Sequence, residues 1–319
     1  MQAAAAQGGA ATTFRHEALL YRGEAEFLAA ALPFIHDGLA AGESVLVAVE
    51  PVKIDVLRRH LGRDGDDVSF VDIAEVGRNP ATIVPLWFDF VERTRPTGQR
   101  CRGIAEPAWP GRSDAALGEC RNHEALVNVA FEGGPSWKMM CPYDVDRLDA
   151  GVIADVRVTH PYLIDDDGVS ANVDYDPNVA GWLGRDDPMP PPAATSGTHL
   201  SAFGTTSLGE IRSAVAAFAS SAGLAATRVD DFVLAINELA GNSLRHGGGE
   251  GEVELWVEGD TVVGEVRDRG SITDPLVGRR RPRPDQSGGR GLWIVNRVSD
   301  LVQIRSRPGS TVVRVHMAR

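Results

Sequence analysis

Cysteine and lysine are scarce in this chain, whose 319 residues include three cysteines and two lysines. The cysteines Cys101, Cys120 and Cys141 are odd in number and widely spaced, which fits a reducing compartment better than a disulfide framework. The sequence also lacks any run approaching the ~18 consecutive apolar residues of a membrane span, and residues 1–13 contain neither a basic segment nor a long apolar one. We therefore expect a soluble, cytoplasmic protein that does not act at a membrane.

Basic charge is also in deficit, with 32 Lys and Arg against 44 Asp and Glu and a formal net charge of −12. This balance argues against direct nucleic-acid binding, which uses a basic surface. Residues 1–200 hold 17 basic and 30 acidic residues, whereas residues 201–319 hold 15 and 14. A chain of this length accommodates two domains of ~150 residues, and the charge asymmetry predicts that their surfaces differ.

Composition divides the chain into a disordered tail (1–13), a first domain (14–183), a proline-rich linker (184–202) and a second domain (203–319). In the first domain, short apolar runs alternate with amphipathic helical patterns, which favours an α/β fold with a mostly parallel sheet. The expected strands are 18–21, 44–49, 68–72, 101–105 and 137–142. The expected helices are 24–40, 53–61, 80–94 and 114–131.

The second domain has a different order of elements. Two helical patterns come first, followed by a hairpin, a short helix and a second hairpin. The expected helices are 207–222, 227–246 and 290–298, and the expected strands are 252–258, 261–268, 301–307 and 310–316. This order predicts an α+β fold with helices on one face of an antiparallel sheet.

The longest helical pattern of the second domain carries a polar face. Glu238, Asn242 and Arg245 follow one another at i, i+4 and i+7 and therefore share one side of the helix. An amide oxygen is a suitable Mg²⁺ ligand, and a carboxylate can take a proton from an incoming nucleophile. The alternative interpretation of this face is a solvated polar surface.

Two glycine-containing motifs follow that helix. Asp268 and Gly270 end an apolar strand, where the carboxylate can accept from an exocyclic amine and the glycine lets a base approach the backbone. Gly288, Gly289 and Gly291 open the short helix, so that backbone N–H groups can converge on phosphates. A single glycine-rich turn is weak evidence, but the three motifs in this order favour a nucleotide site.

These segments, NELAGNSLRHG, DRG and SGGRGLWIV, resemble the N, G1 and G2 boxes of the GHKL (Bergerat-fold) ATPases. The short spacing of the boxes, and Glu238 four residues before Asn242, resemble the branch of bacterial anti-sigma-factor serine kinases. The resemblance implies ATP and Mg²⁺ as cofactors, with Asn242 as the Mg²⁺ ligand, Glu238 as general base and Asp268 as the adenine-binding residue. The other residues that it assigns to the nucleotide site are Arg245, Gly270, Gly289, Arg290, Gly291, Leu292 and Thr311.

Members of that branch phosphorylate a serine or threonine of a small, STAS-type antagonist domain, and many sequester a sigma factor or form homodimers. The resemblance therefore implies a signal-regulated serine/threonine kinase. The alternative is a nucleotide-dependent binding switch that captures a partner without phosphoryl transfer. A basic segment at 279–286 either neutralises phosphate charge or forms a solvated loop. A sensor histidine kinase is disfavoured, because no phosphoacceptor helix precedes the ATPase motifs.

The first domain resembles the MEDS sensory domain in FRHEALLYRGEAEFLAAALPFIHDGLAAGESVLVAVEP and in RNHEALVNVAF. The resemblance covers about 14–165 and implies a RecA-like α/β fold that senses a small ligand. The segment from Gly38 to Glu43 lacks the Gly-Lys-Ser/Thr ending of a phosphate loop, which argues against ATP hydrolysis in this domain. The sequence does not identify the sensory ligand.

Four residues are candidates for the sensory pocket: His16, Glu106, Trp109 and His123. Glu106 and Trp109 follow an expected strand, where open α/β sheets place their ligands. For each of the four, ordinary packing or solvent exposure is the competing interpretation. Cys120 and His123 lie one helical turn apart and form a weak candidate pair of metal or haem ligands.

Overall fold

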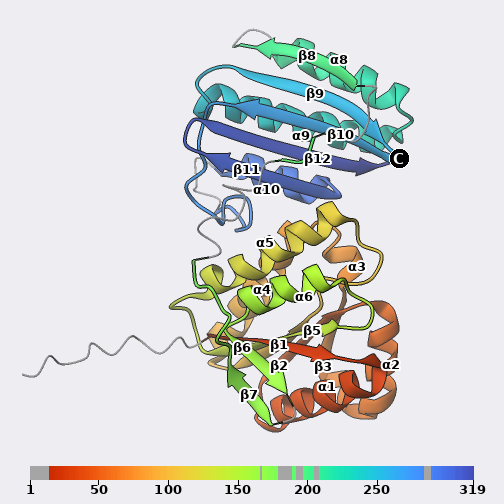
Figure 1. The fold of residues 1–319 in the computed structure, drawn as a ribbon, viewed down its shortest axis with the longest axis vertical. Helices are drawn as coiled ribbons and strands as arrows, with labels where there is room; N and C mark the ends of the chain where they lie inside the picture. Colours follow the sequence, from red (N-terminus) through yellow and green to blue (C-terminus); the bar gives the residue numbers. More distant parts are fainter. Residues whose placement is uncertain (1–13, 166, 179–188, 192–196, 205–207, 284–288) are drawn as a thin grey trace, which may run out of the picture. The chain divides into compact units, whose positions relative to one another are not determined.

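The computed structural model of the chain describes residues 14–165, 167–178, 189–191, 197–204, 208–283 and 289–319 (Figure 1). The expected tail 1–13, most of the expected linker 184–202, and Ser287 and Gly288 lie outside these ranges. None of the helices within them is long and apolar enough to cross a membrane. The described residues build two sheets, each with its own hydrophobic core.

The first sheet has seven strands in the order β3-β2-β4-β5-β1-β6-β7. Its strands are β1 (Phe14–Tyr21), β2 (Ser44–Val49), β3 (Val68–Asp72), β4 (Cys101–Ala105), β5 (Trp137–Asp144), β6 (Tyr162–Asp165) and β7 (Gly168–Ala171). All neighbours pair in parallel except β6 and β7, which form an antiparallel hairpin. The predicted mostly parallel α/β fold is confirmed.

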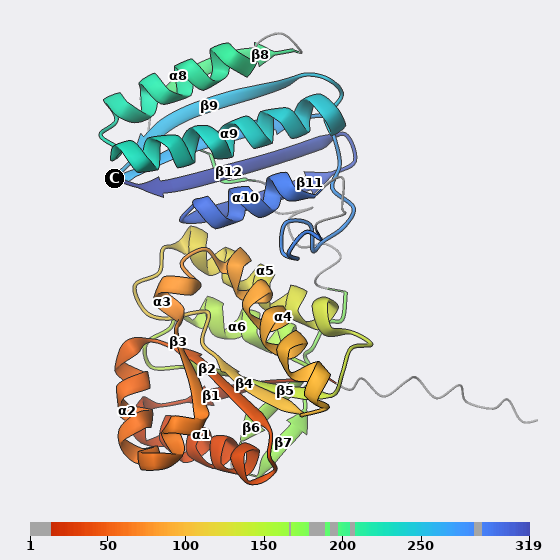
Figure 2. The same ribbon diagram turned by 180° about the vertical axis from the view of Figure 1, so that it is seen from behind.

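Helices cover both faces of this sheet. They are α1 (Gly23–Ala40), α2 (Pro51–Leu61), α3 (Ile73–Val76), α4 (Ile83–Thr94), α5 (Asp114–Phe131) and α6 (Ala150–Thr159). Figures 1 and 2 show α1 and α2 on one face and α4 and α6 on the other. Because both faces are covered, the inner strands are apolar on both sides, and β2 buries five of its six residues.

Individual residues explain how these helices form. In α1, Phe27, Ala31 and Ile35 are buried at i, i+4 and i+8 and form the stripe that packs on the sheet. The helix expected at 53–61 is α2, which begins two residues earlier, at Pro51. Proline is well suited to the first helical position, since it lacks an N–H that would remain unpaired there.

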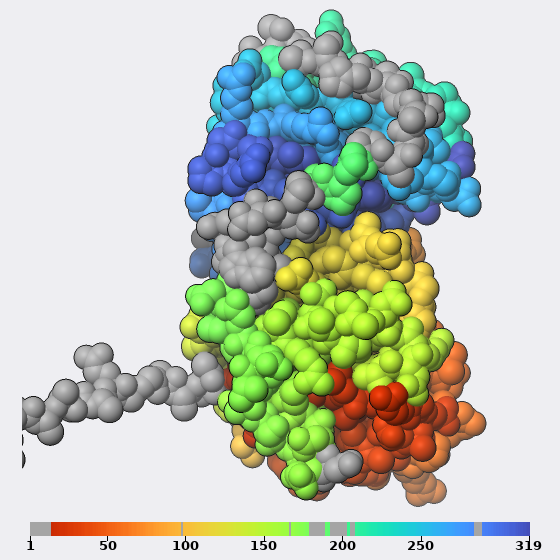
Figure 3. All heavy atoms as spheres, in the orientation of Figure 1, coloured from red at the N-terminus to blue at the C-terminus, as the bar shows by residue number. Residues whose placement is uncertain are grey.

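The helix α6 and the β6–β7 hairpin were not predicted from the sequence. Figure 3 shows the segment from α6 to β7, in light green, as one continuous area of the visible surface. All four residues of β7 are exposed, so this edge strand has no apolar alternation by which it could be recognised.

The second sheet has five strands in the order β11-β12-β10-β9-β8, all paired antiparallel. The strands are β8 (Gly197–Phe203), β9 (Gly251–Glu258), β10 (Thr261–Asp268), β11 (Leu301–Arg307) and β12 (Ser310–Ala318). The helices α8 (Leu208–Ser221), α9 (Ala226–His246) and α10 (Arg290–Val298) lie on one face (Figure 2). The predicted α+β architecture is confirmed, and β8 begins inside the segment expected to be linker.

The position of α9 on the sheet depends on a glycine. A Cβ at Gly264 of β10 would lie 2.7 Å from Cδ1 of Ile236 and 2.9 Å from Cζ of Phe232. Glycine therefore lets two large, fully buried side chains of α9 lie directly against the strand. This close contact fixes the helix that carries Glu238 and Asn242 relative to the strand that carries Asp268.

Candidate functional sites

A cavity of about 260 Å³ lies in the second sheet's unit, where α9, the end of β10, β12 and the start of α10 meet. Seven of the residues predicted for the nucleotide site line it: Asn242, Asp268, Gly270, Gly289, Gly291, Leu292 and Thr311. The predicted residues Glu238, Arg245 and Arg290 are not among its lining residues. Leu239, Val266 and Val313 add apolar walls.

The carboxylate of Asp268 is held by both of its oxygens. The Ser243 hydroxyl of α9 donates to Oδ2 at 2.6 Å, and the backbone N–H of Gly270 donates to Oδ1 at 2.7 Å. Each oxygen of an ionised carboxylate accepts more than one hydrogen bond. Asp268 is therefore oriented by the protein and retains the capacity to accept a further donor from a ligand in the cavity.

Strand register places Thr311 beside that carboxylate. Asp268 of β10 and Ser306 of β11 are both opposite Thr311 of β12. The Ser306 and Thr311 hydroxyls are hydrogen-bonded at 2.8 Å, and Ser306 also accepts from the backbone N–H of Ile272 at 2.8 Å. This chain of contacts ties the segment after β10, which lines the cavity, to the last two strands.

Two glycines allow the backbone to pass close to Asp268. A Cβ at Gly247, just after α9, would lie 2.5 Å from Cγ of Asp268. A Cβ at Gly270 would lie 2.7 Å from the carbonyl oxygen of His246 and 2.9 Å from Oδ1 of Asp268. Because the nearest atom to Gly270 is backbone, a side chain there forces the chain itself to move.

We expect Gly270→Ala to weaken ATP binding by about tenfold, because moving the strand end by a few tenths of an ångström misplaces the Asp268 carboxylate. Isothermal titration of the full chain with ATP measures the effect. Gly209→Ala is the matched control, because a Cβ there meets only the tip of Arg212 at 3.8 Å. Unchanged ATP affinity in Gly270→Ala would show that the close approach at this position is not needed for binding.

Glu238 and Asn242 meet the start of α10. A Cβ at Gly291 would lie 3.0 Å from Oε2 of Glu238 and 3.1 Å from Nδ2 of Asn242. Both side chains thus extend from one face of α9 to the same glycine, as their spacing predicted. Arg245, one turn further along, donates to Oδ1 of Asn242 at 2.9 Å.

The helix α10 begins directly at the cavity. Its N-cap residue, Gly289, has φ = 81°, a conformation that glycine adopts without strain. The first N–H groups of a helix have no partner within the helix and attract anions. Of the basic segment 279–286, positions 284–286 lie outside the described residues, and no arginine in its described part lines the cavity.

In the first sheet's unit, a buried polar cluster lies at the carboxyl ends of the parallel strands. Glu106 follows β4 and is 1% exposed. Its Oε1 accepts from the Lys53 ammonium of α2 and, at 3.4 Å, from the Tyr21 hydroxyl at the end of β1. Burial raises the pKa of Glu106 to about 7, although the Lys53 charge partly opposes this rise.

This pKa predicts a pH-dependent stability. Because folded Glu106 keeps its proton to a higher pH than the unfolded chain does, its stabilising contribution is present at low pH and is lost as the pH rises through about 7. The loss is on the order of 3 kcal/mol from about pH 5 to pH 8. In thermal melts of the full chain, Glu106→Gln should remove this decline, whereas the exposed control Glu24→Gln should follow the wild type. Parallel profiles for wild type and Glu106→Gln would contradict the assignment.

The four candidates for a sensory pocket lie on or after three elements of the first sheet's unit: β1, β4 and α5. His16 lies on β1 and is hydrogen-bonded through Nδ1 to Asn128 of α5 at 3.1 Å. His123 is fully buried on α5, and Trp109 is partly exposed after β4. A cavity of about 580 Å³ in this unit is lined by other residues, among them Glu43, Asp67 and Arg93.

Comparison with protein families assigns both parts of the chain. Residues 15–161 match the MEDS family, described as the methanogen/methylotroph, DcmR sensory domain. Residues 203–317 match the histidine kinase-like ATPase domain. The chain contains a MEDS domain followed by a histidine kinase-like ATPase domain. The ATPase domain holds the cavity of about 260 Å³, and the MEDS domain holds the Glu106 cluster.

Among solved structures, the RsbU and RsbW domains of Rv1364c from Mycobacterium tuberculosis are 20% identical to this chain, with a TM-score of 0.31. The match covers 40% of this chain and 33% of that chain, so it spans about a third of the solved protein's length. Comparison with curated proteins finds no match.

Several residues of these sites were not predicted from the sequence. In the ATPase domain they are Ser243, Ser306 and Gly247, which position Asp268 and Thr311. Gly247 directly follows the expected helix 227–246, and its close approach to Asp268 depends on the packing of that helix on the sheet. In the MEDS domain, Lys53 and Tyr21 lie far from Glu106 in sequence, and no local motif links them.

Proposed function

We propose that the protein is an ATP-dependent serine/threonine kinase of the anti-sigma-factor type, regulated by its MEDS domain. The observation that carries the proposal is the cavity of the ATPase domain. There, a strand-end carboxylate, a glycine-rich helix start and Asn242 converge, and Glu238 lies beside Gly291 of that helix start. The match to the histidine kinase-like ATPase family supports ATP as the ligand.

The cavity suits an adenine nucleotide in shape and in chemistry. Its apolar walls, which include Leu239, Val266 and Val313, match the faces of a purine ring. Asp268 can accept a hydrogen bond from the exocyclic amine of adenine, whereas the carbonyl group that guanine carries in that position would oppose it. We infer that Asp268 selects adenine and that Gly270, which has no side chain, leaves room for the adenine ring beside the end of β10.

The opposite end of the cavity suits phosphates. We infer that the N-terminus of α10, with Gly289 and Gly291, binds the phosphates, and that Asn242 supplies an oxygen ligand to Mg²⁺. Bound Mg²⁺–ATP supplies the phosphoryl group and neutralises its charge. Arg245, one helical turn after Asn242, and Arg290, next to Gly291 in the chain, are proposed to add positive charge at this end.

Glu238 is proposed to be the general base. Its carboxylate lies beside Gly291, at the phosphate end of the cavity and one helical turn from Asn242. There it can orient the hydroxyl of a protein substrate and accept its proton during transfer. On the resemblance to anti-sigma-factor kinases, the proposed substrate is a serine or threonine of a STAS-type antagonist, and a sigma factor is the second proposed partner.

Transfer of labelled phosphate tests this proposal. The full chain is co-purified with its partners from cells and incubated with ATP labelled at the γ-phosphate. We expect acid-stable, base-labile label on a partner protein, as phosphoserine or phosphothreonine. Acid-labile label on the chain itself would contradict the proposal, because it would indicate phosphohistidine.

A second candidate function is a nucleotide- and ligand-dependent binding switch without phosphoryl transfer. The observation that favours it is the hydrogen bond from Arg245 to Oδ1 of Asn242, the oxygen proposed to bind Mg²⁺. If this bond persists with nucleotide bound, the Arg245 charge beside that oxygen opposes Mg²⁺ binding there. The same experiment separates the two functions, since a switch retains its partner in an ATP-dependent manner and transfers no label.

A further inference from the structure

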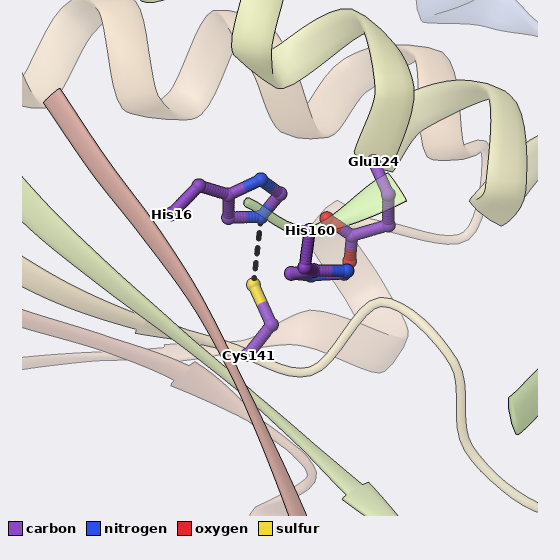
Figure 4. A group of neighbouring side chains, drawn as sticks. All are labelled: His16, Glu124, Cys141 and His160. Carbon is purple, nitrogen blue, oxygen red and sulfur yellow. Dashed lines mark hydrogen bonds between the residues drawn. The ribbon is translucent and has the colours of Figure 1, made fainter. Parts of the chain in front are cut away.

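Four potential metal ligands gather in the interior of the MEDS domain, away from the Glu106 cluster. They are His16, Glu124, Cys141 and His160, and one ligand atom from each lies within 4.8 Å of the others (Figure 4). Their exposed fractions are 1%, 3%, 0% and 0%. The group is thus closed to solvent and contains two nitrogen donors, one sulfur and one carboxylate.

The fold brings these residues together from four elements. His16 is on β1 and Cys141 on β5, which pair in parallel with Ala18 opposite Cys141. Because alternate residues of a strand share a face, His16 and Ala18 lie on the same side as Cys141. His160 follows α6 directly, and Glu124 lies on α5 one turn before Asn128.

Both histidines are oriented by hydrogen bonds on the side away from the cluster. Nδ1 of His16 lies 3.1 Å from the amide oxygen of Asn128, and Nδ1 of His160 lies 2.9 Å from the carbonyl oxygen of Val156. The Thr159 hydroxyl, 3.1 Å from Nδ1 of His160, donates to the carbonyl oxygen of Asp155 and can accept in turn. Since these partners accept, each Nδ1 carries the proton and each Nε2 presents a lone pair. This arrangement is the one that metal-binding histidines commonly adopt.

Asn128 links two of the elements. Its amide oxygen faces His16, and its amide nitrogen donates to the carbonyl oxygen of Thr159 at 2.8 Å. The same side chain therefore sets the ring of His16 and ties the residue before His160 to α5. In metal sites, outer contacts of this kind fix the ligands before the metal arrives.

The side chains also face one another closely. Nε2 of His16 lies 3.3 Å from Sγ of Cys141, and the two imidazole rings have centroids 4.1 Å apart. The Tyr143 ring meets His160 edge-on at 5.5 Å. Tetrahedral zinc bonds of ~2.0–2.3 Å place ligand atoms roughly 3.3–3.8 Å apart. A contraction of about an ångström therefore brings the four donors to bonding positions.

We propose that His16, Glu124, Cys141 and His160 form a four-coordinate site for a divalent transition-metal ion, with Zn²⁺ as the preferred occupant. Two imidazoles, a thiolate and a carboxylate are suitable donors for zinc. Two neutral imidazoles and two anionic ligands give a total charge of −2, which offsets the +2 charge of the ion and so compensates a buried charge.

Binding is balanced by the release of one proton from the cysteine. The S–H bond of Cys141 breaks, the sulfur–zinc bond forms and the proton passes to solvent. Glu124 binds as its carboxylate, and both histidines bind as neutral rings through Nε2. With all four positions filled by protein, the site is a structural one that joins β1, β5, α5 and α6.

The test is a titration of the untagged, metal-free full chain with Co²⁺, a spectroscopic substitute for zinc. We expect tetrahedral d–d bands and a thiolate-to-cobalt charge-transfer band that saturate at one equivalent and disappear when Zn²⁺ is added. Proton release at saturation is measured in parallel. Absence of both bands in the wild-type chain would overturn the proposal, whatever the outcome for kinase activity.

Variants assign the ligands. Cys141→Ser should abolish the charge-transfer band, and His160→Gln should weaken cobalt binding by about 100-fold or more, since even outer contacts of metal sites are worth 10–100-fold. Asn128→Ala, which removes an outer contact, should weaken cobalt binding by about 10–100-fold. If Cys141→Ser does not fold, His160→Gln and Asn128→Ala still test the assignment. Unchanged cobalt affinity in both of these variants would overturn it.

Cys120→Ser is the matched control. Cys120 is a buried thiol on α5, one helical turn before Glu124, and it is not a member of the group of four. Its loss should leave the cobalt spectrum and the stoichiometry unchanged. A charge-transfer band that is lost in Cys120→Ser and retained in Cys141→Ser would overturn the proposed ligand set. That result would support the Cys120–His123 pair suggested by the sequence.

Discussion

Replacing Asp268 by asparagine is expected to weaken ATP binding by about 100-fold, because a charge-assisted hydrogen bond to the adenine amine is lost in a largely apolar cavity. Asparagine has nearly the same shape as aspartate and can still accept from the Gly270 N–H through its amide oxygen. The substitution therefore removes the charge with little change in volume. Isothermal titration of the full chain with ATP gives the affinity.

Nucleotide preference separates this effect from general damage to the cavity. A carboxylate accepts from the adenine amine and repels the guanine carbonyl, whereas an amide can donate to that carbonyl. Asp268→Asn should therefore bind ATP more weakly while GTP binding stays the same or improves. A uniform loss for both nucleotides would contradict the role of Asp268 in recognising adenine.

Asp274 provides the control for this experiment. It lines the same cavity, but its carboxylate accepts from the N–H of Leu276 within its own turn. In Asp274→Asn, the N–H of Leu276 donates to a neutral amide oxygen instead of a charged carboxylate oxygen. Because this hydrogen bond is local to the turn, ATP affinity should change by less than about threefold. An effect as large as that of Asp268→Asn would show that overall negative charge, and not the position of Asp268, governs binding.

The lining of the cavity in the ATPase domain was largely predictable because its residues belong to short local motifs. Helical spacing alone put Glu238 and Asn242 on one face, and the strand that ends at Asp268 has the same bounds in sequence and structure. The contacts of Asp268 with Ser243 and of Thr311 with Ser306 depend on helix-to-sheet packing and on strand register. These features join distant segments and leave no periodic signal.

The MEDS domain shows the limit of the same approach. Its parallel strands were recognised because burial on both faces makes them continuous apolar runs, as in β2. Single-residue candidates such as His16 were identified without their partners, since Cys141 is 125 residues away. Only the pairing of β1 with β5 shows that these two side chains share a face. His160 was not among the candidates, because α6, which positions it, was not predicted.

The second large effect is expected at Glu238. Replacing it with glutamine should reduce phosphoryl transfer to a partner by a factor of about 10²–10⁴, the usual contribution of a general base. ATP affinity should change little, because the amide keeps the size of the side chain beside Gly291 and the adenine contacts are remote. Labelled-phosphate transfer and ATP titration of the same preparation measure the two quantities.

A control on the same helix makes this result specific. Asp230 is exposed near the start of α9 and lies more than two turns from Glu238. Asp230→Asn should retain both transfer and binding, so a loss confined to Glu238→Gln arises at the phosphate end of the cavity. Retained transfer in Glu238→Gln would remove this residue from the mechanism. The binding switch would be favoured if the wild-type chain retains its partner in an ATP-dependent manner but transfers no phosphate. In that switch Arg245 holds Asn242, and Glu238 has no proton to accept.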